Sequence, residues 1–179
     1  MIFTCAPTCK HPYHQHGKTA KTAAGMFTSL AAKKLAKRKD GHLNIDVHCH
    51  YFNPTVGQKA AVLNPVEQEV GHIFANQLTR DTNAKQMRDR APMLSDVAVR
   101  IKDMDRMGVD IQAVSPAPFQ YYYFAEPAFG AELARDVNEG MAKLVAQHPD
   151  RLIGLGTVPL QDAELAVKEL KHAVKNLGL

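Results

Sequence analysis

The stretch that decides the fold reads Leu-Asn-Ile-Asp-Val-His-Cys-His and spans residues 43–50. Its apolar residues, Leu43, Ile45 and Val47, alternate with polar ones, which predicts a short buried β-strand. Side chains two positions apart lie on the same face of a strand, so we expect His48 and His50 to project together from its C-terminal end. The stretch therefore predicts that two imidazoles meet at one point of the fold.

A pair of converging imidazoles is half of a metal site. Imidazole is a good ligand for zinc and other first-row metals, and a catalytic zinc takes three protein ligands and leaves one position for water. We therefore expect His48 and His50 to bind a divalent metal such as zinc. The alternative is two histidines at a strand end without a metal, because His-x-His is a short and common pattern.

Positive charge is concentrated at the N-terminal end of the chain. The 179 residues carry a formal charge of +4, and 45% hydrophobic with 22% charged residues is ordinary for one soluble globular domain. Residues 1–40 hold eight of the 22 Lys and Arg residues but only one of the 18 acidic residues. The rest of the chain is thus mildly acidic, which argues against a nucleic-acid-binding protein.

Cysteine usage and hydropathy indicate the compartment. The three cysteines offer no disulfide framework and suit a reducing environment. No apolar run approaches the roughly 20 residues of a membrane span. The dense charge of residues 33–39 follows the short apolar stretch 26–35, whereas a secretory signal has its charges first. We expect a cytoplasmic protein that does not bind a membrane.

Residues 1–42 are expected to form a basic, flexible N-terminal extension. Residues 1–17 contain two cysteines and three histidines without a CxxC pair, so a loosely packed tail is favoured over a structural zinc site. Residues 19–39 have helical character, either as a solvated helix or as an amphipathic helix that lies on the body, a partner or a membrane surface. The domain proper is predicted over residues 43–179.

Beyond residue 92 the chain repeats helix and strand in a regular order. The predicted elements are a helix over residues 94–107, a strand over 109–117, a helix over 129–147, a strand over 152–160 and a helix over 163–177. Three βα units in series imply parallel strands with right-handed crossovers, and a closed TIM barrel needs eight units. We therefore expect an α/β fold, the N-terminal part of a metal-dependent (β/α)8 TIM barrel within a longer protein. The alternative is a complete small open-sheet domain.

Three further segments carry expectations of their own. Residues 51–92 show no sustained period and follow the first strand, where barrel enzymes place the loops that shape their active sites. The aromatic run of residues 119–124 either walls a substrate or packs against the body. The strand over 152–160 is apolar enough to be buried on both faces, and Gly154 and Gly156 are expected at points of close packing.

Three stretches resemble one known family. Ile45–His50 is similar to the Asp-x-His-x-His strand that opens the amidohydrolase superfamily. Val99–Val109, followed by Gln112-Ala113, and Pro149–Gln161 resemble its amidohydrolase-related branch (amidohydrolase 2), which includes aminocarboxymuconate-semialdehyde decarboxylase. The resemblance covers residues 43–179 and implies a metal-dependent TIM barrel.

The resemblance also implies roles for single residues. His48 and His50 are implied as ligands of zinc, or of manganese in some members, and the remaining ligands and the catalytic residues are expected beyond Leu179. Three other histidines do not match the family's strand ends: His72, His148 and His172. In the decarboxylase an arginine after the first strand holds the substrate carboxylate, and Arg88 and Arg90 lie in the corresponding region. For each of them an ordinary surface arginine is the alternative.

The function implied is that of a metal-dependent decarboxylase, a carbon–carbon lyase, which acts on a small carboxylated ring or a muconate-like acid. One alternative is a metal-dependent hydrolase of the same superfamily. The other is a non-catalytic fragment that lacks the downstream ligands. The full-length protein is expected to bind a small carboxylated substrate and to form a homodimer.

Overall fold

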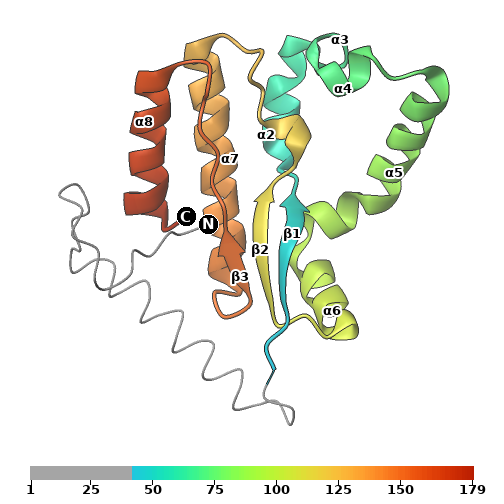
Figure 1. The fold of residues 1–179 in the computed structure, drawn as a ribbon, viewed down its shortest axis with the longest axis vertical. Coiled ribbons are helices and arrows are strands. Elements are labelled where there is room, and N and C mark those ends of the chain that lie inside the picture. Colours follow the sequence, from blue (N-terminus) through green and yellow to red (C-terminus); the bar gives the residue numbers. More distant parts are fainter. Residues whose placement is uncertain (1–41) are drawn as a thin grey trace, which may run out of the picture. The chain divides into compact units, whose positions relative to one another are not determined.

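The computed structural model describes residues 42–179 (Figure 1). Of the predicted extension over residues 1–42, only residue 42 lies within the described part, so this domain boundary stays a prediction. Residues 44–179 form one unit. Among the described residues, no helix has both the length and the apolar character needed to cross a membrane.

Helices of four to 21 residues, two 3-10 helices, a π-helical turn and three strands make up this unit. In chain order they are β1 (Ile45–Tyr51), α2 (Pro54–Lys59), the 3-10 helix η1 (Ala60–Leu63), α3 (Pro65–Gln68), α4 (Val70–Ile73), α5 (Gln77–Ser95), α6 (Val97–Met107), β2 (Ile111–Pro116), the 3-10 helix η2 (Pro118–Gln120), α7 (Pro127–Gln147), β3 (Leu152–Gly154), α8 (Ala163–His172) and the π-helical turn η3 (Ala173–Leu177). The helices α6, α7 and α8 lie where the sequence predicts them.

The three strands form one parallel sheet in the order β1-β2-β3. Helix α6 leads from β1 to β2, and α7 leads from β2 to β3 and packs beside α8 (Figure 1). This topology confirms the predicted α/β fold with three βα units. It also means that β1 pairs with only one strand of the described part.

Local side chains and glycines define several helix ends. The Asp96 carboxylate accepts hydrogen bonds from the first backbone amides of α6, and Asp162 does the same for α8. Gly108 ends α6 at φ 70° and Gly178 ends η3 at φ 74°. Glycine adopts this left-handed conformation without steric cost, so both helices end where it occurs.

The prediction that β1 is a buried strand is wrong for its first half. Ile45 is 47% exposed and Val47 is 74% exposed. Their exposure shows that no described element covers these two side chains. In the second half of the strand Cys49 and Tyr51 pack against the apolar core. The end of β1 that carries the histidines is therefore the supported end.

The third strand is shorter than predicted. β3 covers Leu152–Gly154, and the chain leaves the sheet after the Leu155 N–H has donated to the Val114 carbonyl of β2. The reason is a competing set of hydrogen bonds from the buried Asn138 side chain in α7. Its Oδ1 accepts from the Thr157 backbone N–H at 2.7 Å, and its Nδ2 donates to the Thr157 carbonyl at 2.8 Å. Leu155 and Leu160 are exposed, so the prediction of burial on both faces is also wrong beyond Gly154.

The segment over residues 51–92 is mostly helical, which the sequence pattern did not predict. It contains α2, η1, α3, α4 and most of α5, and Figure 1 shows α5 on the side of β1 away from β2. No residue of the nineteen in α5 is buried. A helix with no buried face has no apolar periodicity, so the usual sign of a helix is missing.

Two apolar clusters form the core. One lies between α2, the aromatic run and α7, and consists of Val56, Ala60, Tyr122, Ala125, Leu133 and Val137. The other lies between the sheet, α6 and α7, and consists of Met104, Val114, Met141, Leu144 and Leu152. The second cluster also receives Cys49 and Tyr51 and so supports the C-terminal half of β1.

Close packing at Gly154, as predicted, leads to a test. A Cβ atom there would lie 2.9 Å from Met141 Cγ and would also clash with the Leu179 side chain. We expect Gly154→Ala to lower the free energy of unfolding by about 1–3 kcal/mol, because overpacking forces the neighbours to shift. Urea unfolding followed by circular dichroism measures the change.

The matched control is Gly71→Ala, since a Cβ at Gly71 would meet no atom within 4 Å. This substitution should leave stability unchanged or raise it slightly, because Ala is the better helix former. An equal loss in the two variants would show that packing at Gly154 is not the cause.

Candidate metal centre and its cavity

The two histidines of β1 lie together at the C-terminal end of the strand. Their ring centroids are 5.2 Å apart and the rings meet edge to face. This geometry agrees with the prediction from the strand period. Two imidazoles at this separation fit neighbouring positions around one divalent ion, and nitrogen ligands suit zinc and other first-row metals.

The register of β1 shifts between Asp46 and Cys49. Asp46 lies opposite Gln112, whereas Cys49 lies opposite Val114, so three steps on β1 match two on β2. Such a bulge changes where the side chains point. Here the Asp46 carboxylate accepts from Gln112 Nε2 at 2.9 Å and from the His48 backbone N–H at 3.0 Å. Asp46 is therefore used to hold the strands in register.

His50 is held by the end of β2. Its Nδ1 lies 2.9 Å from Ser115 Oγ and 3.2 Å from the Pro116 carbonyl oxygen. Ser115 lies directly opposite His50 in the sheet, and its hydroxyl also donates to the Cys49 carbonyl at 3.2 Å. One nitrogen of the His50 ring is thus engaged by protein groups.

The backbone beside His50 is held by Arg100, which is 6% exposed although it is charged. Its guanidinium donates to the His50 carbonyl at 2.5 Å and to Gln112 Oε1 at 3.0 Å. Burial lowers the pKa of Arg100, but the ordinary value of a guanidinium is so high that the group stays charged. The sequence contained a sign of this role, since Arg100 follows Val97 by three positions and precedes Met104 by four on the apolar face of α6.

Cys49 is not suited to join the two histidines as a thiolate ligand. Burial raises the pKa of its thiol to about 11, and this effect exceeds the opposing one of the Arg100 charge. The thiol donates to the Ala113 carbonyl at 3.4 Å, and Cys49 packs in the core cluster. The group therefore stays protonated at neutral pH.

No group of three His, Cys, Asp or Glu residues that would hold a metal occurs within residues 42–179. None of the three other histidines named above joins the pair in such a group within the described residues. His148 ends α7, and His72 lies near Phe119 with 6.1 Å between ring centroids. His172, in the last turn of α8, is partly buried, and its Nε2 atom is fully enclosed.

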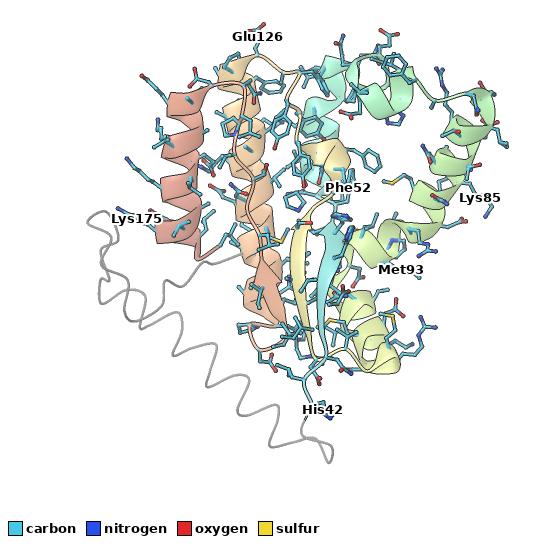
Figure 2. The ribbon with its side chains drawn as sticks, viewed as in Figure 1. His42, Phe52, Lys85, Met93, Glu126 and Lys175 are labelled. Carbon is cyan, nitrogen blue, oxygen red and sulfur yellow. The ribbon has the colours of Figure 1, made fainter. Side chains whose placement is uncertain are left out.

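A cavity of about 460 Å³ adjoins His50 and distinguishes the two candidate arginines. Arg90 lines it, together with the apolar side chains of Met87, Leu94 and Phe119. Arg88 is exposed on α5 and does not line it. The structure thus brings Arg90 and His50 to one cavity and leaves Arg88 outside. Met93, labelled in Figure 2, is another of its lining residues.

A second cavity of about 340 Å³ shares Asn83, Met87 and Phe119 with the first. Phe52 lines it and is labelled in Figure 2. A larger cavity of about 780 Å³ lies against α2, α6 and α7 and contains neither histidine of the pair. We take the His50 cavity as the candidate site, because it combines a metal-binding side chain with a cation.

The aromatic run mostly packs against the body. Tyr122 is buried, and Phe124 packs on the same core cluster. Tyr121 and Tyr123 stack on each other with ring centroids 5.5 Å apart. Phe119 alone of these five rings lines the candidate cavity. Packing is therefore the main role of the run, and Phe119 is the ring that a bound molecule would meet.

The chain is similar to one known protein family and to several proteins of known activity. The family model described as Amidohydrolase matches residues 45–179. The chain is 39% identical over 84 residues to 2-amino-3-carboxymuconate-6-semialdehyde decarboxylase of Dictyostelium discoideum, a match that covers 47% of this chain and 23% of the relative.

Two solved structures are similar as well. The 5-carboxyvanillate decarboxylase of Sphingomonas paucimobilis matches with a TM-score of 0.62 and 29% identity, over 76% of this chain and 41% of that chain. The dihydroxybenzoic acid decarboxylase of Polaromonas sp. JS666, solved with manganese and 2-nitroresorcinol, matches with a TM-score of 0.58 and 25% identity, over 77% and 36%. The chain thus spans less than half the length of each protein named, and the predicted partial barrel is confirmed.

The role of Arg100 can be tested by removing its charge. Arg100→Met keeps an apolar stem but leaves the His50 carbonyl and Gln112 without their donor. We expect the free energy of unfolding to fall by about 3 kcal/mol, since buried acceptors of a charged donor lose their partner. Urea unfolding measures this loss.

Arg106→Met is the matched control on the same helix. Arg106 is exposed and, among the described residues, forms an i,i+3 ion pair with Asp103. Its loss should change stability by no more than about 0.5 kcal/mol. If both variants behave alike, the buried hydrogen bonds of Arg100 do not carry the effect.

Proposed function

The chain belongs to the amidohydrolase family, and on this premise we propose that the protein is a metal-dependent decarboxylase of a small carboxylated ring or muconate-like acid. The observation that carries the proposal is that His50, whose ring meets that of His48, lines the same cavity as Arg90. The three similar proteins named above are all decarboxylases, which supports this reaction over hydrolysis.

His48 and His50 would hold the metal, which we expect to be zinc or manganese. A divalent ion bound there supplies Lewis acidity that polarises substrate oxygens. Manganese is supported by the Polaromonas relative, and zinc by the preference of imidazole for this metal. The further ligands and the catalytic acid expected beyond Leu179 stay predictions, as do the homodimer and the cytoplasmic location.

Arg90 is the better candidate for binding a substrate carboxylate. A guanidinium pairs with a carboxylate through two parallel hydrogen bonds, which fixes the orientation of the acid as well as its position. The side chains of Met87, Leu94 and Phe119 give the cavity apolar walls beside this cation. The apolar walls also suit a ring. In decarboxylation the carbon–carbon bond breaks, its electron pair stays on the ring carbon, and that carbon takes a proton as carbon dioxide leaves.

The metal requirement is tested by His48→Ala and His50→Ala in the full-length protein. Each variant should abolish release of carbon dioxide from a panel of carboxylated muconate semialdehydes and hydroxybenzoates, because each imidazole fixes the metal. A chelator should do the same to the wild type, and added zinc or manganese should restore turnover.

His148→Ala is the control, since His148 lies at the end of α7, apart from the pair. Turnover that survives chelation and both strand substitutions would refute the metal mechanism. Hydrolysis of a lactone or amide without loss of carbon dioxide would instead favour the hydrolase alternative.

Substitutions of the two arginines should differ in their effect on kcat/KM in the same assay. We expect Arg90→Ala to lower kcat/KM by roughly 10- to 100-fold, the equivalent of one charged hydrogen-bonding partner. Arg88→Ala should behave as a surface change worth no more than about 0.5 kcal/mol in stability. A larger loss of kcat/KM in the Arg88 variant than in the Arg90 variant would reverse the assignment.

A further inference from the structure

Ser115 stands at a point where three hydrogen-bonding groups of the sheet meet. Its hydroxyl donates to the Cys49 carbonyl at 3.2 Å and lies 2.9 Å from His50 Nδ1. The carbonyl of the next residue, Pro116, is 3.2 Å from the same nitrogen. Ser115 thus contacts both the ring of His50 and the backbone between the two histidines.

These contacts determine which nitrogen of the neutral ring carries the proton. The Pro116 carbonyl can only accept, so a hydrogen bond to it requires a proton on Nδ1. The hydroxyl hydrogen of Ser115 is directed at the Cys49 carbonyl, which leaves its oxygen lone pairs to accept from Nδ1. The opposite tautomer would place the Nδ1 lone pair against the carbonyl oxygen and would draw Ser115 away from Cys49. Both contacts therefore favour the Nδ1-protonated ring.

We propose that Ser115 is a positioning residue that holds His50 as the Nδ1-protonated tautomer, with Nε2 as its lone-pair nitrogen for a metal. The inference rests on the proposed metal role of the histidine pair. Hydrogen bonds to the second ring nitrogen orient a metal-binding histidine and make its other nitrogen more basic. Because the same hydroxyl binds the Cys49 carbonyl, it also fixes the backbone from which both rings project. Ser115 itself touches neither metal nor substrate in this role.

The tautomer is measured directly by long-range 15N–1H correlation spectra of the metal-free, full-length protein labelled at histidine. At a pH where the ring is neutral, wild-type His50 should carry its proton on Nδ1, and the His50→Ala spectrum assigns the signals. Ser115→Ala should raise the share of the Nε2-protonated form, with the tautomer ratio changing by about fivefold, as expected for the loss of one neutral hydrogen bond. Ser115→Thr keeps a hydroxyl and should restore the wild-type ratio.

Ser95→Ala is the matched control, since the Ser95 hydroxyl donates to the Ala91 carbonyl within its own helix. It should leave the His50 tautomer unchanged. A wild-type ring protonated on Nε2, or a tautomer ratio that does not differ between Ser115→Ala and Ser95→Ala, would overturn the inference.

Metal affinity gives a second readout that does not depend on turnover. In competition with a zinc indicator, Ser115→Ala should weaken zinc binding by roughly tenfold, as is usual for the loss of a group that orients a ligand. Ser115→Thr and Ser95→Ala should bind zinc as the wild type does. If His48→Ala and His50→Ala leave zinc binding intact, the proposed metal role fails, whereas the tautomer spectra test the role of Ser115 separately.

Discussion

The buried guanidinium of Arg100 is the interaction on which the candidate site depends. It donates to acceptors on two neighbouring strands, the His50 carbonyl of β1 and Gln112 of β2. Gln112 in turn donates to Asp46 at the other end of the β1 bulge. A single side chain of α6 therefore holds together the strand end that carries the histidines, the strand beside it, and the helix that covers both. Its rigid fork of donors makes such a multiple contact possible, and a lysine would not match it.

The histidine pair and Arg90, the two parts of the candidate site, are held in place to different degrees by the surrounding structure. The histidines project from a strand whose end packs on the core, and His50 is held through its ring by Ser115 and through its carbonyl by Arg100. Arg90 projects from α5, a helix without a buried residue. A metal needs fixed ligands, since its bond lengths tolerate little variation. An ion pair between Arg90 and a substrate carboxylate tolerates more movement, because the long arginine side chain can follow the substrate.

The bulge in β1 explains why an Asp-x-His-x-His strand does not present three ligands on one face. A regular strand would place Asp46 on the face of His48 and His50. The register shift instead lets the Asp46 carboxylate bind Gln112 and the His48 backbone N–H. The aspartate thus serves the geometry of the sheet, and the same contact that removes it from the metal keeps β1 and β2 in register.

The sequence by itself determined the features that depend on local chemistry. The apolar pattern located α6, α7 and α8, and the spacing of His48 and His50 predicted that the rings meet. The tertiary structure alone decided the features that depend on what lies opposite a residue. Asn138 ends β3 early, α5 forms without an apolar face, and only the cavity distinguishes Arg90 from Arg88. Ser115 meets His50 across 65 positions of sequence, a contact that no local pattern records, because it exists only once two parallel strands have paired in register.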